Sequence, residues 1–99
     1  MSEPSAVTVT AQTVAKLARG VWLREDPVRG QTVLLAPERA LALDEIAVMI
    51  VNALDGERNL DAIAEEFSVN FEAPKDRILS DMIAFVDKFS KRRMLELKS

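Results

Sequence analysis

Residues 31–44 read QTVLLAPERALALD, and this stretch decides the fold. Its first part, Gln31 to Leu35, is rich in β-branched and bulky residues and is typical of a strand. Pro37 marks a turn. Beyond it, Ala40–Leu43 has leucine at alternate positions, which puts both leucines on one face of a further strand. Propensity alone favours a helix for Ala-Leu-Ala-Leu, but we expect a strand, because the turn sends the chain back along the hairpin.

A third strand is predicted just before this stretch. Residues 21–24, VWLR, have the same extended character, and Pro27 and Gly30 in the segment that follows are turn signals. The three segments together predict an antiparallel sheet. Residues 1–16 are small, rich in Ser and Thr and weakly patterned, so we expect a flexible tail or linker there, with at most a stray strand formed by Val7, Val9 and Val14. The domain itself is expected over 17–97.

The remainder of the chain is predicted to be helical. Asp44 is a good N-cap for a first helix, and Gly56 stands where a left-handed C-cap residue is expected. Asn59 is a possible cap for a second helix, and a third begins at Pro74 and runs to about Arg93. The prediction is therefore an α+β fold, winged-helix-like, with a three-stranded antiparallel sheet followed by three helices.

The third predicted helix has an unusually wide apolar face. Its large apolar side chains span an arc of about 160°, which is wider than one packing contact needs. The arc comprises Ile78, Leu79, Met82, Ile83, Phe85, Val86 and Phe89. If Ala40–Leu43 is an edge strand, its free backbone groups can accept an extended peptide, and the excess apolar arc would hold that peptide's side chains. For any single residue of the arc, the alternative that it belongs to the hydrophobic core stays open.

The composition argues against catalysis. The chain has 99 residues, enough for one domain, and it contains no His, no Cys and no Tyr. Zinc sites, thiol chemistry and imidazole acid–base chemistry need residues that are missing. Adjacent carboxylates such as Glu65 and Glu66 diverge on a helix, and three glycines supply no phosphate-binding loop. We expect a binding protein with no catalytic residues, no metal and no cofactor.

The charge pattern narrows the class of partner. Asp and Glu number 16 against 13 for Lys and Arg, a net charge of −3, which weighs against nucleic acid. Asp81 and Asp87 on the third helix also disfavour a DNA-recognition role. Five cations gather near the end of that helix, where they either complement the helix dipole or attract an acidic peptide. They are Lys88, Lys91, Arg92, Arg93 and Lys98.

No segment of the sequence predicts membrane insertion. No apolar run reaches the roughly 18–20 residues that a membrane-spanning helix requires. The N-terminus has no basic flank followed by a hydrophobic segment, as a secretory signal would. A cytoplasmic protein is the expectation.

Several segments, taken in order and spacing, resemble one known family. Residues 17–24 (LARGVWLR), 33–44 (VLLAPERALALD) and 54–58 (LDGER), with Asp81-Met82 and Phe85-Val86, are similar to the pyrroloquinoline quinone (PQQ) biosynthesis D proteins. The resemblance covers about residues 16–95. It implies a peptide chaperone that captures the ribosomally made PQQ precursor peptide and presents it to a radical SAM enzyme, which cross-links a Glu and a Tyr of that peptide.

The resemblance also implies a binding site. In this family the ligand adds as a strand beside the third strand and against the third helix. Backbone pairing would fall to Ala40, Leu41, Ala42 and Leu43, and the groove to Ile78, Met82, Phe85 and Phe89. Apart from the resemblance, we infer that Arg39 and Arg77 can meet acidic side chains of the peptide. Two alternatives stay open: a winged-helix DNA-binding transcriptional regulator, and a purely structural subunit.

Overall fold

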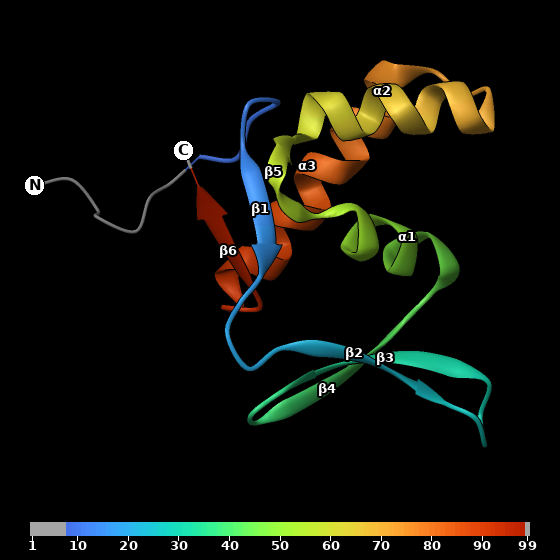
Figure 1. Cartoon of the computed structure of the whole chain (residues 1–99), viewed down its shortest axis with the longest axis vertical. Helices are drawn as coiled ribbons and strands as arrows, with labels where there is room; N and C mark the ends of the chain where they lie inside the picture. The colour runs from blue at the N-terminus through green and yellow to red at the C-terminus, as the bar shows by residue number, and fades with distance from the viewer. Residues whose placement is uncertain (1–7, 99) are drawn as a thin grey trace, which may run out of the picture.

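The computed structural model of the chain describes residues 8–98, which form three helices and six strands in two antiparallel sheets (Figure 1). One sheet has the strand order β2-β3-β4 and the other the order β5-β1-β6. The elements, in chain order, are β1 (Val14–Leu17), β2 (Trp22–Asp26), β3 (Gln31–Ala36), β4 (Arg39–Leu43), α1 (Glu45–Ala53), β5 (Asp55–Asn59), α2 (Leu60–Phe71), α3 (Lys75–Lys91) and β6 (Leu95–Lys98). The predicted α+β class is confirmed.

The β2-β3-β4 sheet is the predicted antiparallel sheet, and it lies at one end of the molecule, below the helices in Figure 1. Leu34 of β3 stands opposite Leu41 of β4, and paired residues share a face. Leu34 is fully buried, so this face is turned toward the core. The other face carries Trp22, which is 53% exposed. The alternation in QTVLLAPERALALD thus fixes which side of the sheet is inside.

The helix starts agree with the sequence, but one predicted helix end is wrong. The Asp44 carboxylate accepts a hydrogen bond from the Ala47 amide at 2.7 Å, as an N-cap does. Asn59 caps α2 in the same way through Ala62 at 2.8 Å. Gly56, expected to end α1, lies instead inside β5, with φ +78°. There it is buried against β1: a Cβ on Gly56 would stand 3.2 Å from Cδ of Lys16.

The second sheet was not predicted, and it corrects the expected tail. β1 is the central strand of this sheet, between β5 and β6, and Thr13 and Ala15 are buried. Residues 8–16 therefore belong to the folded domain, while residues 1–7 of the expected tail lie outside the described residues. The segment contains β-branched residues, but its weak pattern of apolar and polar residues did not distinguish a central strand from a tail. α3 also ends at Lys91, two residues before the predicted end, and β6 follows.

The side chains that join the helices to the second sheet make up most of the core. Leu60 and Ile63 of α2, Met82 and Val86 of α3, and Met94 just before β6 are fully buried. α2 and α3 pack against each other, and α3 contacts β6. None of the helices in residues 8–98 has the length and apolar character needed to span a membrane.

Asp55, at the start of β5, is held as a carboxylate by its own turn. Its Oδ1 accepts hydrogen bonds from the amides of Glu57 at 2.9 Å and Arg58 at 3.0 Å, and its Oδ2 accepts one from the Arg58 guanidinium at 3.2 Å. The backbone hydrogen bonds from Arg58 and Glu57 lower the pKa of Asp55 below its ordinary value. The Arg58 guanidinium also forms an ion pair with the Glu66 carboxylate of α2, with Nη1 2.6 Å from Oε1, and this pair links the turn to that helix.

We expect this turn to make stability depend on acidity. Because the pKa of Asp55 is lower in the folded state, its ionised form stabilises the fold at neutral pH, and that contribution is lost as the pH falls through the folded pKa. Asp55→Asn should lower the free energy of unfolding at neutral pH and make a smaller difference at an acidic pH below 3.8, the ordinary pKa of this carboxyl. Urea unfolding of both proteins at the two pH values checks this. An equal difference at both values would contradict it.

Candidate functional site

A cleft of about 360 Å³ lies between the end of β4, the start of α1 and the second half of α3. It brings together four residues that the sequence predicted for the site: Ala42 and Leu43 from β4, and Phe85 and Phe89 from α3. The other lining residues are Asp44, Ala47, Asp81, Ala84 and Lys88. Strand backbone and aromatic side chains thus face one another across a single hollow, the arrangement expected for holding an extended peptide.

β4 is an edge strand, paired with β3 and with no second neighbour among the described residues. Its register shows which backbone groups are free. A β-turn is closed by a hydrogen bond from the N–H of its fourth residue to the C=O of its first residue. In the turn between β3 and β4 the first residue is Ala36 and the fourth is Arg39, so these two form a hydrogen-bonded pair. Bonded and non-bonded pairs then alternate along the strands, so Ala40 and Ala42 direct their N–H and C=O groups away from β3. Both residues are exposed.

The wall opposite β4 is aromatic. The rings of Phe85 and Phe89 stack with centroids 4.3 Å apart and planes 17° apart. Phe89 is buried in the core and Phe85 is only half-buried. Phe85 therefore offers the exposed apolar surface of this wall, and Phe89 supports its ring from beneath. Ala84, small and exposed, leaves the approach to the cleft open.

The other predicted site residues lie elsewhere. Ile78 and Met82 line a separate pocket with α1 and α2, and Met82 is fully buried. Leu41 is half-buried on the core face of β4, while Arg39 and Arg77 are exposed outside the cleft lining. The predicted groove is thus divided in two, because the first half of α3 faces α1 and only its second half faces β4.

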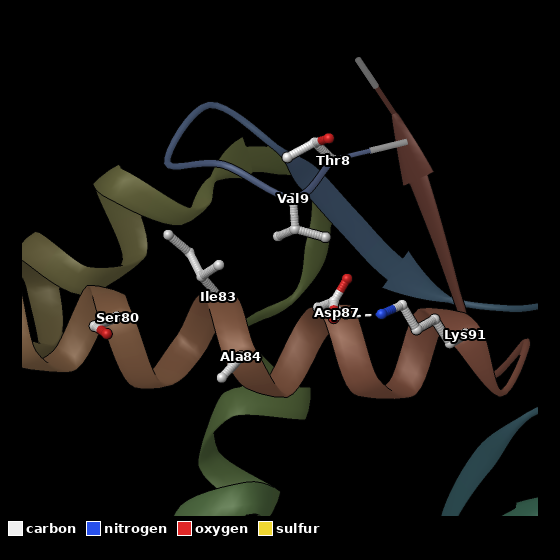
Figure 2. Close-up of a pocket in the computed structure, with 7 residues that line it drawn as sticks. All are labelled: Thr8, Val9, Ser80, Ile83, Ala84, Asp87 and Lys91. Atoms are coloured by element: carbon white, nitrogen blue, oxygen red, sulfur yellow. Dashed lines mark ion pairs between the residues drawn. The ribbon is translucent and has the colours of Figure 1, made fainter. Parts of the chain in front are cut away.

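The remaining side of α3 is covered by the chain just before β1 (Figure 2). Ile83 and the buried Val9 project toward each other across a shallow pocket, and Asp87 pairs with Lys91 at 3.1 Å at the pocket's edge. α3 is therefore lined by three parts of the chain: Val9 on one side, α1 and α2 on another, and the end of β4 across the cleft. Met82, Val86 and Phe89 of the wide apolar arc are buried in the core, while the half-buried Phe85 gives the arc its open surface beside β4.

Charged residues that the sequence analysis had not assigned to the site stand on the cleft's rim. Asp81 and Lys88 flank Phe85 at i−4 and i+3, so helical spacing from Phe85 was a signal that could have found both. The five cations near the end of α3 that the sequence groups together, the basic cluster, do not all reach the cleft. Lys91 pairs with Asp87, and Lys98 donates a hydrogen bond to the Gly56 carbonyl at 3.0 Å. Lys88 is the member of the cluster that reaches the cleft.

The ionisable groups that line the cleft are Asp44, Asp81 and Lys88, all on its rim. Among residues 8–98, no group of three or more Asp or Glu side chains is arranged to hold a metal ion. The arrangement can bind an extended apolar segment with some charge selectivity. The fold and the cleft thus define a small domain built to bind another chain.

Comparison with known proteins agrees with this class. Residues 31–95 match the model of the family described as Coenzyme PQQ synthesis protein D (PqqD). The chain is 62% identical over 92 residues to the PqqA binding protein of Rhizobium meliloti (strain 1021), covering 93% of this chain and 94% of the relative. It is 39% identical over 89 residues to the PqqA binding protein of Xanthomonas euvesicatoria pv. vesicatoria (strain 85-10), covering 90% and 97%. The chain belongs to the PqqD family.

Two solved structures are similar to the fold. The first is the solution NMR structure of the PqqD truncation of Methylobacterium extorquens PqqCD, described as a functional, stand-alone recognition element for ribosomally synthesized, post-translationally modified peptides. It superposes with a TM-score of 0.80 at 36% identity, over 96% of this chain and 99% of that one. The crystal structure of PqqD from Xanthomonas campestris gives a TM-score of 0.57 at 38% identity, over 81% and 89%. The fold described above is therefore that of a PqqD recognition element.

Proposed function

We propose that this protein is a peptide chaperone of PQQ biosynthesis that binds the precursor peptide PqqA by adding it as a strand to β4. One observation carries the proposal: the free backbone edge at Ala40 and Ala42 stands beside a cleft walled by Phe85. Main-chain pairing at an edge supplies affinity, and side-chain pockets supply selectivity. The relatives named as PqqA binding proteins support PqqA as the ligand.

The role that follows is non-catalytic and takes place in the cytoplasm. The protein holds PqqA in an extended form and presents it to the radical SAM enzyme of the pathway, which cross-links a Glu and a Tyr of the peptide. The cleft offers apolar surface and three rim charges but no thiol, hydroxyl or imidazole side chain, so it suits retention of a substrate and leaves the chemistry to the partner. Lys88 on the rim favours an acidic side chain of the peptide at that end of the cleft.

A titration with synthetic PqqA followed by NMR tests the proposed site. Backbone amides of Ala40–Leu43 and resonances of Phe85 should shift together on binding, because the added strand contacts both. Shifts confined to the Glu25–Gly30 hairpin turn would overturn the proposal. A gel shift with duplex DNA over a range of salt concentrations examines the DNA-binding alternative, since binding to phosphates falls steeply with salt.

Phe85→Ala should weaken PqqA binding by about 1–3 kcal/mol, because a central aromatic side chain often anchors an interface. The matched control is Ile83→Ala. Ile83 is also half-buried on α3 but faces Val9, on a side away from the cleft (Figure 2), so this change should reduce stability without altering affinity. Isothermal titration calorimetry of the two folded variants gives the comparison. Equal affinities for both variants and the wild type would remove Phe85 from the site.

A further inference from the structure

A second apolar pocket, of about 330 Å³, lies between α1, α2 and α3. Its lining is apolar except for Asp81, the one charged residue there among the described residues. The floor is formed by core residues such as Met82, which is fully buried. Phe67 and Phe71 of α2 form one wall with their rings edge to face, centroids 5.7 Å apart.

Exposed apolar side chains are concentrated around this pocket. Ile46 is 65% exposed, Phe71 52% and Met49 36%, and these are three of the six large hydrophobic residues recorded as exposed among residues 8–98. Isolated exposed hydrophobic residues are ordinary, but a group of them around a hollow marks a binding site.

The pocket adjoins the cleft beside β4. Asp81 lines both, and α1 separates them, with Ala47 facing the cleft and Ile46 facing the pocket. A peptide paired with β4 that continues past the C-terminal end of the strand meets the start of α1 and the side chain of Asp81. The next hollow along that path is the second pocket.

We propose that this pocket is a second subsite for the same peptide. It takes a large apolar side chain from the peptide residues that lie beyond the C-terminal end of β4, with a Lys or Arg of the peptide placed against Asp81. The inference rests on the proposed function. A folded partner protein or a second copy of the chain fits less well, because a stable protein interface needs about 800 Å² from each side, whereas the exposed apolar surface here is confined to the rim of one small hollow.

The test compares Ile46→Asp with Val69→Asp in calorimetric titrations with synthetic PqqA. Ile46 lies in the first turn of α1, where a carboxylate is favourable, so the variant should fold. Val69 of α2 is exposed, at 67%, but lies outside both pockets. We expect the dissociation constant to rise about tenfold or more with Ile46→Asp, as for loss of an anchor, and to be unchanged with Val69→Asp.

Two further measurements locate the peptide segment and its cation. Shortening PqqA from the end that occupies the pocket should weaken wild-type binding to the level of Ile46→Asp and leave that variant unaffected; shortening it from the other end should preserve the difference. Asp81→Asn should weaken binding several-fold at low salt, with a smaller effect at high salt, because salt screens exposed charges.

The outcomes separate this inference from the proposed function. If the amides of β4 still shift with PqqA but Ile46→Asp binds like the wild type, the second subsite is overturned and the strand-addition site stands. If Ile46→Asp keeps its affinity for PqqA but fails to retain the radical SAM enzyme in a pull-down, the pocket belongs to the enzyme, and the inference is likewise overturned. If PqqA causes no NMR shift of the β4 amides, the proposed function is overturned, and the second subsite, which rests on it, is overturned as well.

Discussion

Replacing Ala42 with proline should abolish or severely weaken binding of PqqA while leaving the domain folded. The register of β3 and β4 directs the Ala42 amide to the free edge, so proline removes a donor that the added strand needs and no bond that the sheet uses. The peptide carbonyl opposite is then left unpaired, and the proline ring obstructs the approach. The dissociation constant should rise about 5-fold to 160-fold, since an unsatisfied buried partner costs about 1–3 kcal/mol.

Leu41→Pro is the matched control for that experiment. The Leu41 amide points the other way, toward its partner Leu34, so proline at this position breaks the existing sheet. Leu41→Pro should therefore lower the thermal midpoint clearly, whereas Ala42→Pro should shift it little. Circular dichroism melting of both variants, alongside calorimetric titration with PqqA, gives the comparison. Wild-type affinity in a folded Ala42→Pro variant would show that the peptide is not added to β4.

Met82→Ala should have the largest effect on stability among the changes considered. Met82 is fully buried between the helices, and truncating such a residue leaves a cavity, at a cost of about 2–5 kcal/mol. A domain of this size is stable by only about 5–15 kcal/mol, so the loss is a large fraction of the total. Urea unfolding measures it. PqqA affinity, determined well below the melting temperature, should change less than with Phe85→Ala, because Met82 lies beneath the second pocket with no exposed surface for a ligand to contact.

Ser80→Ala on the same helix provides the reference for Met82→Ala. Ser80 is exposed, and alanine is a better helix former than serine. The free energy of unfolding of the Ser80→Ala variant should therefore equal or slightly exceed that of the wild type. The opposite pattern for Met82→Ala, with unchanged stability and lost peptide binding, would place Met82 in a ligand groove and outside the core. The two measurements together therefore decide which role this residue has.

The elements predicted correctly are those whose signal lies within a few neighbouring residues. The hairpin around Pro27 was predictable because turn residues separate two strongly β-forming segments. The hairpin around Pro37 was predictable because a turn follows a β-forming segment and leucine then alternates along Ala40–Leu43. Asp44 and Asn59 were predictable as caps, because a cap bonds to an amide three residues ahead. β1, β5 and β6 were not predicted, since their partners are distant in sequence and their own residues are small or charged.

The candidate site was only partly predictable for the same reason. A helical wheel shows that Phe85, Phe89 and Met82 share a face, but it does not show what covers each part of that face. In the structure Met82 is enclosed by α1 and α2, and Val9 covers the side at Ile83. Beside β4, the surface at Phe85 remains open, with Asp81 and Lys88 next to it. Helical spacing alone did not separate these positions.

The sequence by itself determined the strand pattern of residues 31–44, the helix caps, the absence of His, Cys and Tyr, and the family resemblance. These follow from local sterics, short-range hydrogen bonds and composition. Only the tertiary structure decided that residues 8–16 are part of the fold, that the amides of Ala40 and Ala42 are free, and that the apolar face of α3 is divided between core, cleft and a second pocket. The physical reason is that burial depends on which distant segments pack against a side chain, and that information is spread over the whole chain.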